Sequence, residues 1–320
     1  MSESAIGNAD HGRPTRRLGL VGRPSGAWWH QTHCQNPFAQ RLSDGSVRVH
    51  FAGRDERNRS RAGWLNVEYN SSRFTSSECA AEPSLDIGRL GTFDDSGAMP
   101  SSLVESPSGL LLYYTGWTLG GTVPFQFEIG CAVSHDAGRT FERVSEAPVF
   151  GRNRFDPLLL GAPWVLKEGS DFRMWYVSGT EWVPPAAGET RPTHFYTIKH
   201  AWSADGIRWE SDDHLCIPFR DDEYAVARPI VQRTAAGFEM WYSARRHGET
   251  YRVYSARSAD GLTWIRNNEP LLATGVLEWE REMVCYAAPL TQGNTSLMLY
   301  NGNDYGKAGF GAVELPADSF

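Results

Sequence analysis

The feature that most constrains the fold of this chain is a short apolar strand, rich in aromatic residues, that recurs along the sequence. Its copies cover residues 47–53, 110–116, 172–179, 238–243 and 297–302. Each copy places an aromatic residue before a small one, at intervals of 58–66 residues: Phe51, Tyr114, Tyr176, Tyr242 and Tyr300. A near-constant interval over most of the chain predicts a repeat architecture. We expect the apolar residues of these strands to form the core.

Two further patterns complete each repeat. A strand marked by Pro precedes the aromatic strand, and a Gly-containing turn joins the two as in a β-hairpin. A third strand ends in a turn where Ser and Asp are followed by Gly and an aromatic residue. In these turns Asp136, Asp205 and Asp260 are expected to accept backbone hydrogen bonds and therefore to be structural. A fourth short strand fits after each turn.

Four short strands in each of five repeats predict an all-β fold, a five-bladed β-propeller with four antiparallel strands per blade. A strand over residues 17–22 would close the last blade. A β-sandwich is the rival fold, but its strands do not repeat at this interval. Residues 1–16 are predicted to be a disordered tail, and residues 17–320 a single propeller domain.

The composition of the chain limits the binding partners and the cellular location that can be predicted for the protein. The formal net charge of −7 argues against nucleic acid or an anionic membrane, since both favour a basic surface. The five Cys residues are scattered without C-x-x-C spacing, which favours a reducing compartment. No signal peptide or membrane span is apparent in the sequence, so a cytoplasmic location is predicted.

The first strands of propeller blades line a central channel, and their beginnings converge at one mouth. The segments that lead into these strands are therefore the place to search for a ligand site. They are rich in acids, arginines and aromatic residues, a mixture that suits a polar, ring-like ligand such as a sugar. The candidates that would contact substrate are His33, Asn36, Glu181, Trp182, Arg228, Glu282 and Tyr286.

At this point the chain resembles the five-bladed furanosidase clan, which includes the family 43 arabinanases and β-xylosidases, invertases and levansucrases. The resemblance rests on the Met-Trp-Tyr strands and the Ser-x-Asp-Gly turns, and covers about residues 28–315. It implies a glycoside hydrolase-like enzyme with a carboxylate base, an orienting Asp and a Glu acid. Glu223 is the acid by this resemblance, and Asp156, in Arg154-Phe155-Asp156-Pro157, or Asp95 is the orienting carboxylate.

The first repeat departs from the clan's pattern. The invertase-like phrase Asn-Asp-Pro is here Gln35-Asn36-Pro37, so an amide stands where the nucleophilic carboxylate belongs. Hydrolysis by two carboxylates then needs another base, for which His33, His30 or an acid of the fifth repeat are candidates.

Three functions remain open at this stage. The first is glycosidase-like acid/base or glycosyl-transfer chemistry on a carbohydrate or sugar-bearing small molecule. The second is a lyase, cyclase or isomerase that reuses the pocket, and the third is a glycan-binding propeller without catalysis. No cofactor or metal site is predicted. The candidate acids also have structural explanations. Asp156 and Glu223 could bond loop N–H groups or pair with Arg154 and Arg228, and Asp95 could cap a turn.

Overall fold

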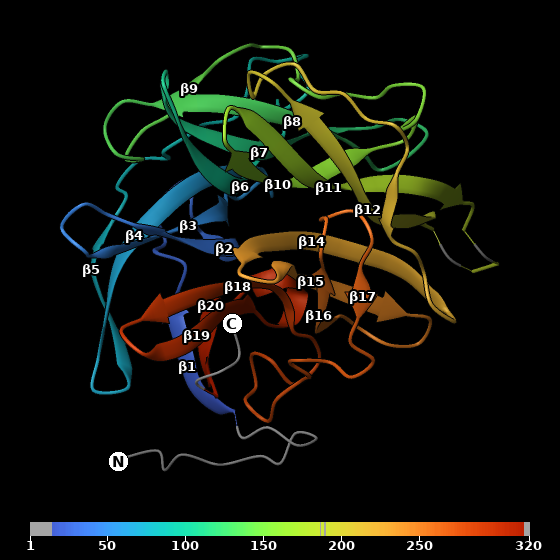
Figure 1. The fold of residues 1–320 in the computed structure, drawn as a ribbon. Coiled ribbons are helices and arrows are strands. Elements are labelled where there is room, and N and C mark those ends of the chain that lie inside the picture. Colours follow the sequence, from blue (N-terminus) through green and yellow to red (C-terminus); the bar gives the residue numbers. More distant parts are fainter. Residues whose placement is uncertain (1–14, 186, 189, 317–320) are drawn as a thin grey trace.

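The structure is a computed structural model that describes residues 15–185, 187–188 and 190–316. It confirms the predicted all-β class. In the described residues the one helix is α1, the four-residue segment Asn303–Gly306, and twenty strands make up the rest of the regular structure (Figure 1). No helix in this part of the chain is long and apolar enough to cross a bilayer.

The strands fall into antiparallel groups along the chain. The first group holds β2 (Thr32–Arg41), β3 (Val47–Arg54), β4 (Ser60–Asn70) and β5 (Arg73–Cys79). The second holds β6 (Gly97–Ser106), β7 (Gly109–Leu119), β8 (Phe125–Ser134) and β9 (Glu142–Arg143). A single parallel pair, Ser60 with Gly97, joins the two groups into one eight-stranded sheet.

A second eight-stranded sheet is built in the same way. One group holds β10 (Leu160–Glu168), β11 (Asp171–Val183), β12 (Thr193–Ser203) and β13 (Leu215–Ile217). The next holds β14 (Glu223–Thr234), β15 (Gly237–Arg246), β16 (Arg252–Ser258) and β17 (Ile265–Arg266). The parallel pair Tyr196–Ala225 connects them.

The last sheet combines both ends of the described chain. It contains β18 (Cys285–Gln292), β19 (Thr295–Asn301), β20 (Phe310–Leu315) and the N-terminal strand β1 (Arg16–Gly22). β1 pairs antiparallel with β20, as the sequence predicts for the strand over residues 17–22. Of the predicted disordered tail, residues 1–14 lie outside the described residues, and Arg16 already belongs to β1.

The first strands of the groups lie side by side around the middle of the molecule (Figure 1). β2 contacts β6 and β18, β10 contacts β6 and β14, and β14 contacts β18. These contacts close a ring, so residues far apart in sequence meet where the five strands begin. This ring positions the candidate site.

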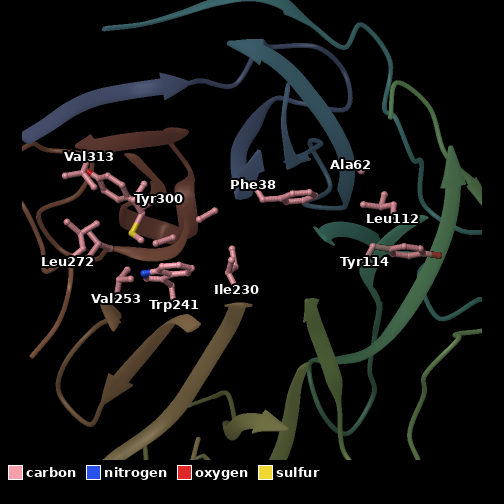
Figure 2. Packing of buried hydrophobic residues seen from close by; sticks show 14 of the residues in the cluster. Phe38, Ala62, Leu112, Tyr114, Ile230, Trp241, Val253, Leu272, Tyr300 and Val313 are labelled. Atoms are coloured by element: carbon pink, nitrogen blue, oxygen red, sulfur yellow. The ribbon is translucent and has the colours of Figure 1, made fainter. Parts of the chain in front are cut away.

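The recurring aromatic strands form the core, as expected from the sequence. Met174, Trp175 and Tyr176 are fully buried, as are the corresponding residues of β15. Figure 2 shows Trp241 and Tyr300 on one side of the view and Leu112 and Tyr114 on the other, with Phe38 and Ile230 between them. Burial of such large apolar side chains is the main stabilising contribution to a fold built from short strands.

The Ser-x-Asp-Gly turns have the structural role that the sequence predicts. Asp205 Oδ1 accepts the backbone N–H groups of Ile207 and Arg208, both at 2.8 Å. Gly206 has a φ of 76°, a left-handed conformation that favours glycine. Tyr113 of β7 donates its hydroxyl to the Gly206 carbonyl at 2.8 Å, so this turn also docks onto the preceding group.

Candidate functional site

Two of the three acids predicted to be catalytic, Asp156 and Glu223, are buried within ion-paired networks. Asp156 is fully buried, and its carboxylate accepts hydrogen bonds from Tyr176 at 2.9 Å and Ser178 at 2.6 Å. Lys199 Nζ lies 3.2 Å from Asp156 Oδ1. Each oxygen of Asp156 therefore already has partners within the protein.

Glu223 is held in the same way. Its side chain is 1% exposed, and Oε1 accepts a hydrogen bond from Arg266 Nη2 at 2.8 Å. The other oxygen accepts the backbone N–H of Arg220 at 3.0 Å. Arg266 in turn donates from Nε to the hydroxyl of Tyr242 at 2.8 Å. The partner of Glu223 is Arg266, rather than the Arg228 considered from the sequence.

Two further acids, one of them the fifth-repeat Glu280, have the same surroundings. Asp94 accepts from the Tyr114 hydroxyl at 2.9 Å and from Arg143 Nε at 2.7 Å. Glu280 bonds both Tyr300 and Arg17. We call the four arrangements the acid–tyrosine clusters: Asp94–Tyr114–Arg143, Asp156–Tyr176–Lys199, Glu223–Tyr242–Arg266 and Glu280–Tyr300–Arg17.

The first group of strands, β2 to β5, lacks an acid–tyrosine cluster and so shows when the acid is present. In each cluster the acid precedes its tyrosine by 19 or 20 residues. The aromatic at the corresponding place in β3 is Phe51, which has no hydroxyl, and the residue 20 positions earlier is Gln31 rather than an acid. The carboxylate is therefore present where a buried tyrosine hydroxyl needs a partner, a pattern typical of a structural cross-link.

Asp95 occupies a loop outside the clusters. Its carboxylate accepts the N–H of Gly91 at 3.0 Å and the hydroxyls of Ser96 and Thr118 at 2.9 and 2.7 Å. Partial burial favours the protonated form, but these hydrogen bonds outweigh it and lower the pKa of Asp95.

A second set of residues lies where the first strands meet. Each of these strands carries a bulge at the place where it passes the aligned aromatic residue of the neighbouring strand: Phe51, Tyr114, Tyr176, Tyr242 or Tyr300. We call the residues that open these bulges the bulge ring: Asn36, Pro100, Ala162, Arg228 and Tyr286.

The bulge ring is strained and carries no carboxylate. Four of its members have positive φ: 57° for Asn36, 46° for Ala162, 55° for Arg228 and 55° for Tyr286. Non-glycine residues held in this conformation cost free energy and cluster at functional sites. A carboxylate pair for glycoside hydrolysis would therefore have to come from residues outside the bulge ring.

Arg228 spans the ring. It is 1% exposed, donates from Nη1 to the Ser101 carbonyl at 3.1 Å and from Nη2 to the Asn36 carbonyl at 3.3 Å. Its guanidinium carbon lies 5.7 Å from the centroid of the Phe38 ring. Burial lowers the pKa of Arg228 to about 9, opposed by nearby Tyr286, so the side chain stays charged at neutral pH.

Tyr286 connects the ring to a wall of aromatic residues. Its ring centroid lies 6.0 Å from those of Tyr251 and Tyr305, and it is stacked on Tyr305. Tyr196 also belongs to this cluster, and Trp182 packs against its edge. Tyr286, Tyr305 and Trp182 are partly exposed, and such aromatic faces are suited to a sugar ring.

Sequence reasoning missed Arg245, at the centre of this wall. Its Nη1 and Nη2 donate to the hydroxyls of Tyr305 at 3.3 Å and Tyr196 at 3.5 Å. Its guanidinium carbon is 4.7 Å from the Tyr224 ring centroid and 4.9 Å from that of Tyr251. A search of the residues that follow each Met-Trp-Tyr strand, rather than those before the first strands, would have found it.

A pocket of about 630 Å³ lies beside Tyr305 and includes His33, Arg54 and Lys307. Burial, then the positive charges of Arg54 and Lys307, lower the pKa of His33 to about 3. Burial likewise lowers the pKa of His30 to about 4. Both imidazoles are therefore neutral and weakly basic at neutral pH, which disfavours them as replacements for a missing carboxylate base.

The other candidates lie farther out. Glu181, near the end of β11, is exposed, while the neighbouring Trp182 packs against His194 at 4.8 Å and Phe125 at 5.5 Å between ring centroids. Glu282 is exposed and lies 3.9 Å from Arg281. Across the described residues, no group of three or more His, Cys, Asp or Glu side chains is arranged to hold a metal ion.

Comparisons with solved structures show what this fold is like. The chain is similar to BT0996 in its solved complex with RGII, with a TM-score of 0.71, 15% identity, and coverage of 94% of this protein and 91% of that one. It is also similar to a thermostable family-43 glycoside hydrolase, with a TM-score of 0.64, 16% identity and 92% coverage of both proteins. The structural neighbours are glycoside hydrolases with propeller folds, and at these identities the likeness establishes the fold.

Comparisons of sequence place the chain among relatives. No protein-family model matches it. It is 37% identical over 303 residues to the uncharacterized protein Rv1502 of Mycobacterium tuberculosis (strain ATCC 25618 / H37Rv), an alignment that covers 94% of this chain and 98% of the relative. With this identity over almost the whole length of both proteins, the chain belongs to the same family as Rv1502.

Proposed function

We propose that the protein is a glycoside hydrolase-like, five-bladed β-propeller that takes a carbohydrate or sugar-bearing small molecule at the bulge ring. The closed contacts among β2, β6, β10, β14 and β18 support the blade count and a single domain over residues 17–320. The glycoside hydrolase neighbours support a carbohydrate as the ligand class.

The observation that carries the proposal is the set of residues in the bulge ring. Asn36, Arg228 and Tyr286 meet there in strained conformations, beside partly exposed tyrosines. A sugar needs flat apolar faces for its ring and hydrogen-bonding groups for its hydroxyls, and this set supplies both. We propose that Asn36, Arg228 and Tyr286 contact the ligand directly. His33, Glu181, Trp182 and Glu282 would contact parts of the ligand that extend beyond the bulge ring.

The chemistry is the second part of the proposal. Hydrolysis with Glu223 as acid and Asp156 or Asp95 as orienting carboxylate is the reaction that the resemblance implies. The acid–tyrosine clusters favour structural roles for Asp156 and Glu223, and the bulge ring has no carboxylate. We therefore favour a protein that binds its carbohydrate, or transforms it without two catalytic carboxylates, over a standard hydrolase.

The test is an incubation of the protein with a panel of neutral and charged oligosaccharides, followed by mass spectrometry and a binding measurement on the same samples. Binding without product supports a glycan-binding protein, and an eliminated or isomerised product supports the lyase or isomerase alternative. Hydrolysis that disappears in both Glu223→Gln and Asp156→Asn, with folding retained, would establish the two-carboxylate mechanism. No binding to any sugar would contradict the proposal.

A cytoplasmic location, and the absence of nucleic-acid or membrane partners, stay predictions from composition. Subcellular fractionation of the natural host tests the first. The RGII complex of a structural neighbour supports an oligosaccharide as one form that the ligand could take.

A further inference from the structure

Three arginines around the bulge ring differ from the cations of the acid–tyrosine clusters. In those clusters Lys199, Arg266 and Arg17 each have a carboxylate partner. Within residues 15–185, 187–188 and 190–316, no carboxylate pairs with the buried Arg228 or with the partly buried Arg54 and Arg245. In each of the three, the buried Nε–H also has no hydrogen-bond acceptor.

Arg228 is the most extreme of the three. Its guanidinium bonds only two backbone carbonyls, although it is almost completely removed from water. A buried charge is costly unless an opposite charge compensates it. In the bulge ring Arg228 lies between Ala162 and Tyr286, both of which are partly exposed, so solvent reaches the ring on either side of it.

Arg54 and Arg245 lie next to the aromatic neighbours of Tyr286. Arg245 donates to the hydroxyl of Tyr305, which is stacked on Tyr286, and Arg54 lines the same pocket as Tyr305. The polar contacts of Arg245 are neutral phenols, and those of Arg54 are the amide oxygens of Gln35 and Asn58, both at 2.8 Å. Three charged forks around one tyrosine leave a positive charge that the protein itself does not neutralise.

We propose that the bulge ring binds an anionic group, a phosphate or a carboxylate, with Arg228 as its principal ligand and Arg54 or Arg245 as a second. The inference rests on the proposed function, because it makes the carbohydrate ligand one that carries a negative charge or binds beside a free anion. The planar guanidinium fork suits both groups, since it can donate two parallel N–H bonds to their oxygens. The aromatic wall beside Tyr286 is left for the uncharged part of the ligand.

The test is isothermal titration calorimetry of the full chain with four probes: inorganic phosphate, glucose 6-phosphate, glucuronate and glucose. We expect at least one anionic probe to bind, and Arg228→Met to weaken it about 10- to 100-fold, the value of a charge-assisted hydrogen bond. Arg228→Lys keeps the charge without the fork and should weaken binding less. Arg233→Met removes an exposed arginine paired with Glu168 and should change nothing.

The probes separate the sources of the anion. Binding of inorganic phosphate by itself indicates a free anion, and binding of only glucose 6-phosphate or glucuronate indicates a charged substituent. If circular dichroism shows that Arg228→Met does not fold, Arg245→Met and Arg54→Met serve in its place. The inference is overturned if neither of these two variants binds the anion more weakly than wild type.

Two other results would also overturn it: wild-type protein that binds no anionic probe at concentrations up to about 10 mM, or equal binding by wild type and Arg228→Met. Should a neutral oligosaccharide bind both proteins equally while the anions do not bind, the inference fails and the proposed function stands. Should phosphate bind while no sugar binds, the proposed function fails instead.

Discussion

Replacement of Glu223 by Gln should destabilise the protein, because Glu223 neutralises a buried arginine. The side chains of Glu223 and Arg266 are only 1% and 4% exposed. Breaking such a pair costs about 3–5 kcal/mol, since it leaves an uncompensated charge away from water. The amide oxygen still accepts from Arg266, which recovers about 1 kcal/mol. We therefore expect the free energy of unfolding to fall by about 3 kcal/mol.

The assay is urea denaturation followed by tryptophan fluorescence, with extrapolation to water. Glu280→Gln is the matched comparison, since Glu280 has the same surroundings in another cluster. Asp94→Asn should cost less, because its partner Arg143 is 20% exposed. The double variant Glu223→Gln with Arg266→Met should be more stable than the sum of its single changes, because the stranded charge is gone.

The structural role of Glu223 is refuted if the free energy of unfolding of Glu223→Gln lies within about 0.5 kcal/mol of the wild-type value while Glu280→Gln is strongly destabilised. A turnover that is lost in Glu223→Gln without any loss of stability would then identify Glu223 as a catalytic acid. Equal destabilisation of both variants, with sugar binding intact, supports the structural role.

Three further predictions concern charge and turns. Arg228→Met should raise the free energy of unfolding of the ligand-free protein by about 0 to 1 kcal/mol, because removal of a buried, unpaired charge outweighs the loss of two hydrogen bonds. A large loss of stability in urea denaturation would contradict this. Burial lowers the pKa of His50 to about 3, so the unfolded state binds its proton first as pH falls below about 6.5. The stability contributed by neutral His50 should thus decline by about 1.4 kcal/mol per pH unit below that value, and His50→Gln should show a shallower decline between neutral and acidic pH; an unchanged slope would show that His50 does not titrate on unfolding. Asp260→Ala should lower the thermal midpoint by removing the acceptor for Leu262 and Thr263, at a cost of about 1–2 kcal/mol, and an unchanged midpoint would contradict a structural role for this turn.

The strands and turns were predictable because their signals are local. An aromatic run such as residues 172–179 has one stable place, a buried strand, and Asp205 before Gly206 has one common use, a tight turn. Both could be recognised from neighbouring residues alone. The all-β class and the pairing of the N-terminal strand with β20 followed from such patterns.

The site was less predictable because its partners are distant in sequence. Glu223 lies 43 residues from Arg266, and nothing near either residue reveals that they form a pair. A carboxylate in a segment leading into a first strand has the same local appearance whether it serves a substrate or a buried tyrosine. The clusters became visible only when Asp94, Asp156, Glu223 and Glu280 could be compared in space.

Arg228 was a candidate because it lies in a segment that leads into a first strand, but its lack of a carboxylate partner was not predicted. Among residues that lead into first strands, an arginine near Glu223 suggested an ion pair. The bulge instead turns Arg228 towards the carbonyls of Asn36 and Ser101, while Arg266 takes the carboxylate. Arg245 escaped notice because its partners are tyrosines on four different segments.

The most direct test of the account is a crystal structure of the protein grown with tungstate, an anion whose position is visible by anomalous scattering. The account predicts a bound anion whose oxygens lie about 3 Å from the guanidinium nitrogens of Arg228, between Ala162 and Tyr286. Anomalous density confined to exposed arginines and lysines, with none at the bulge ring, would contradict it.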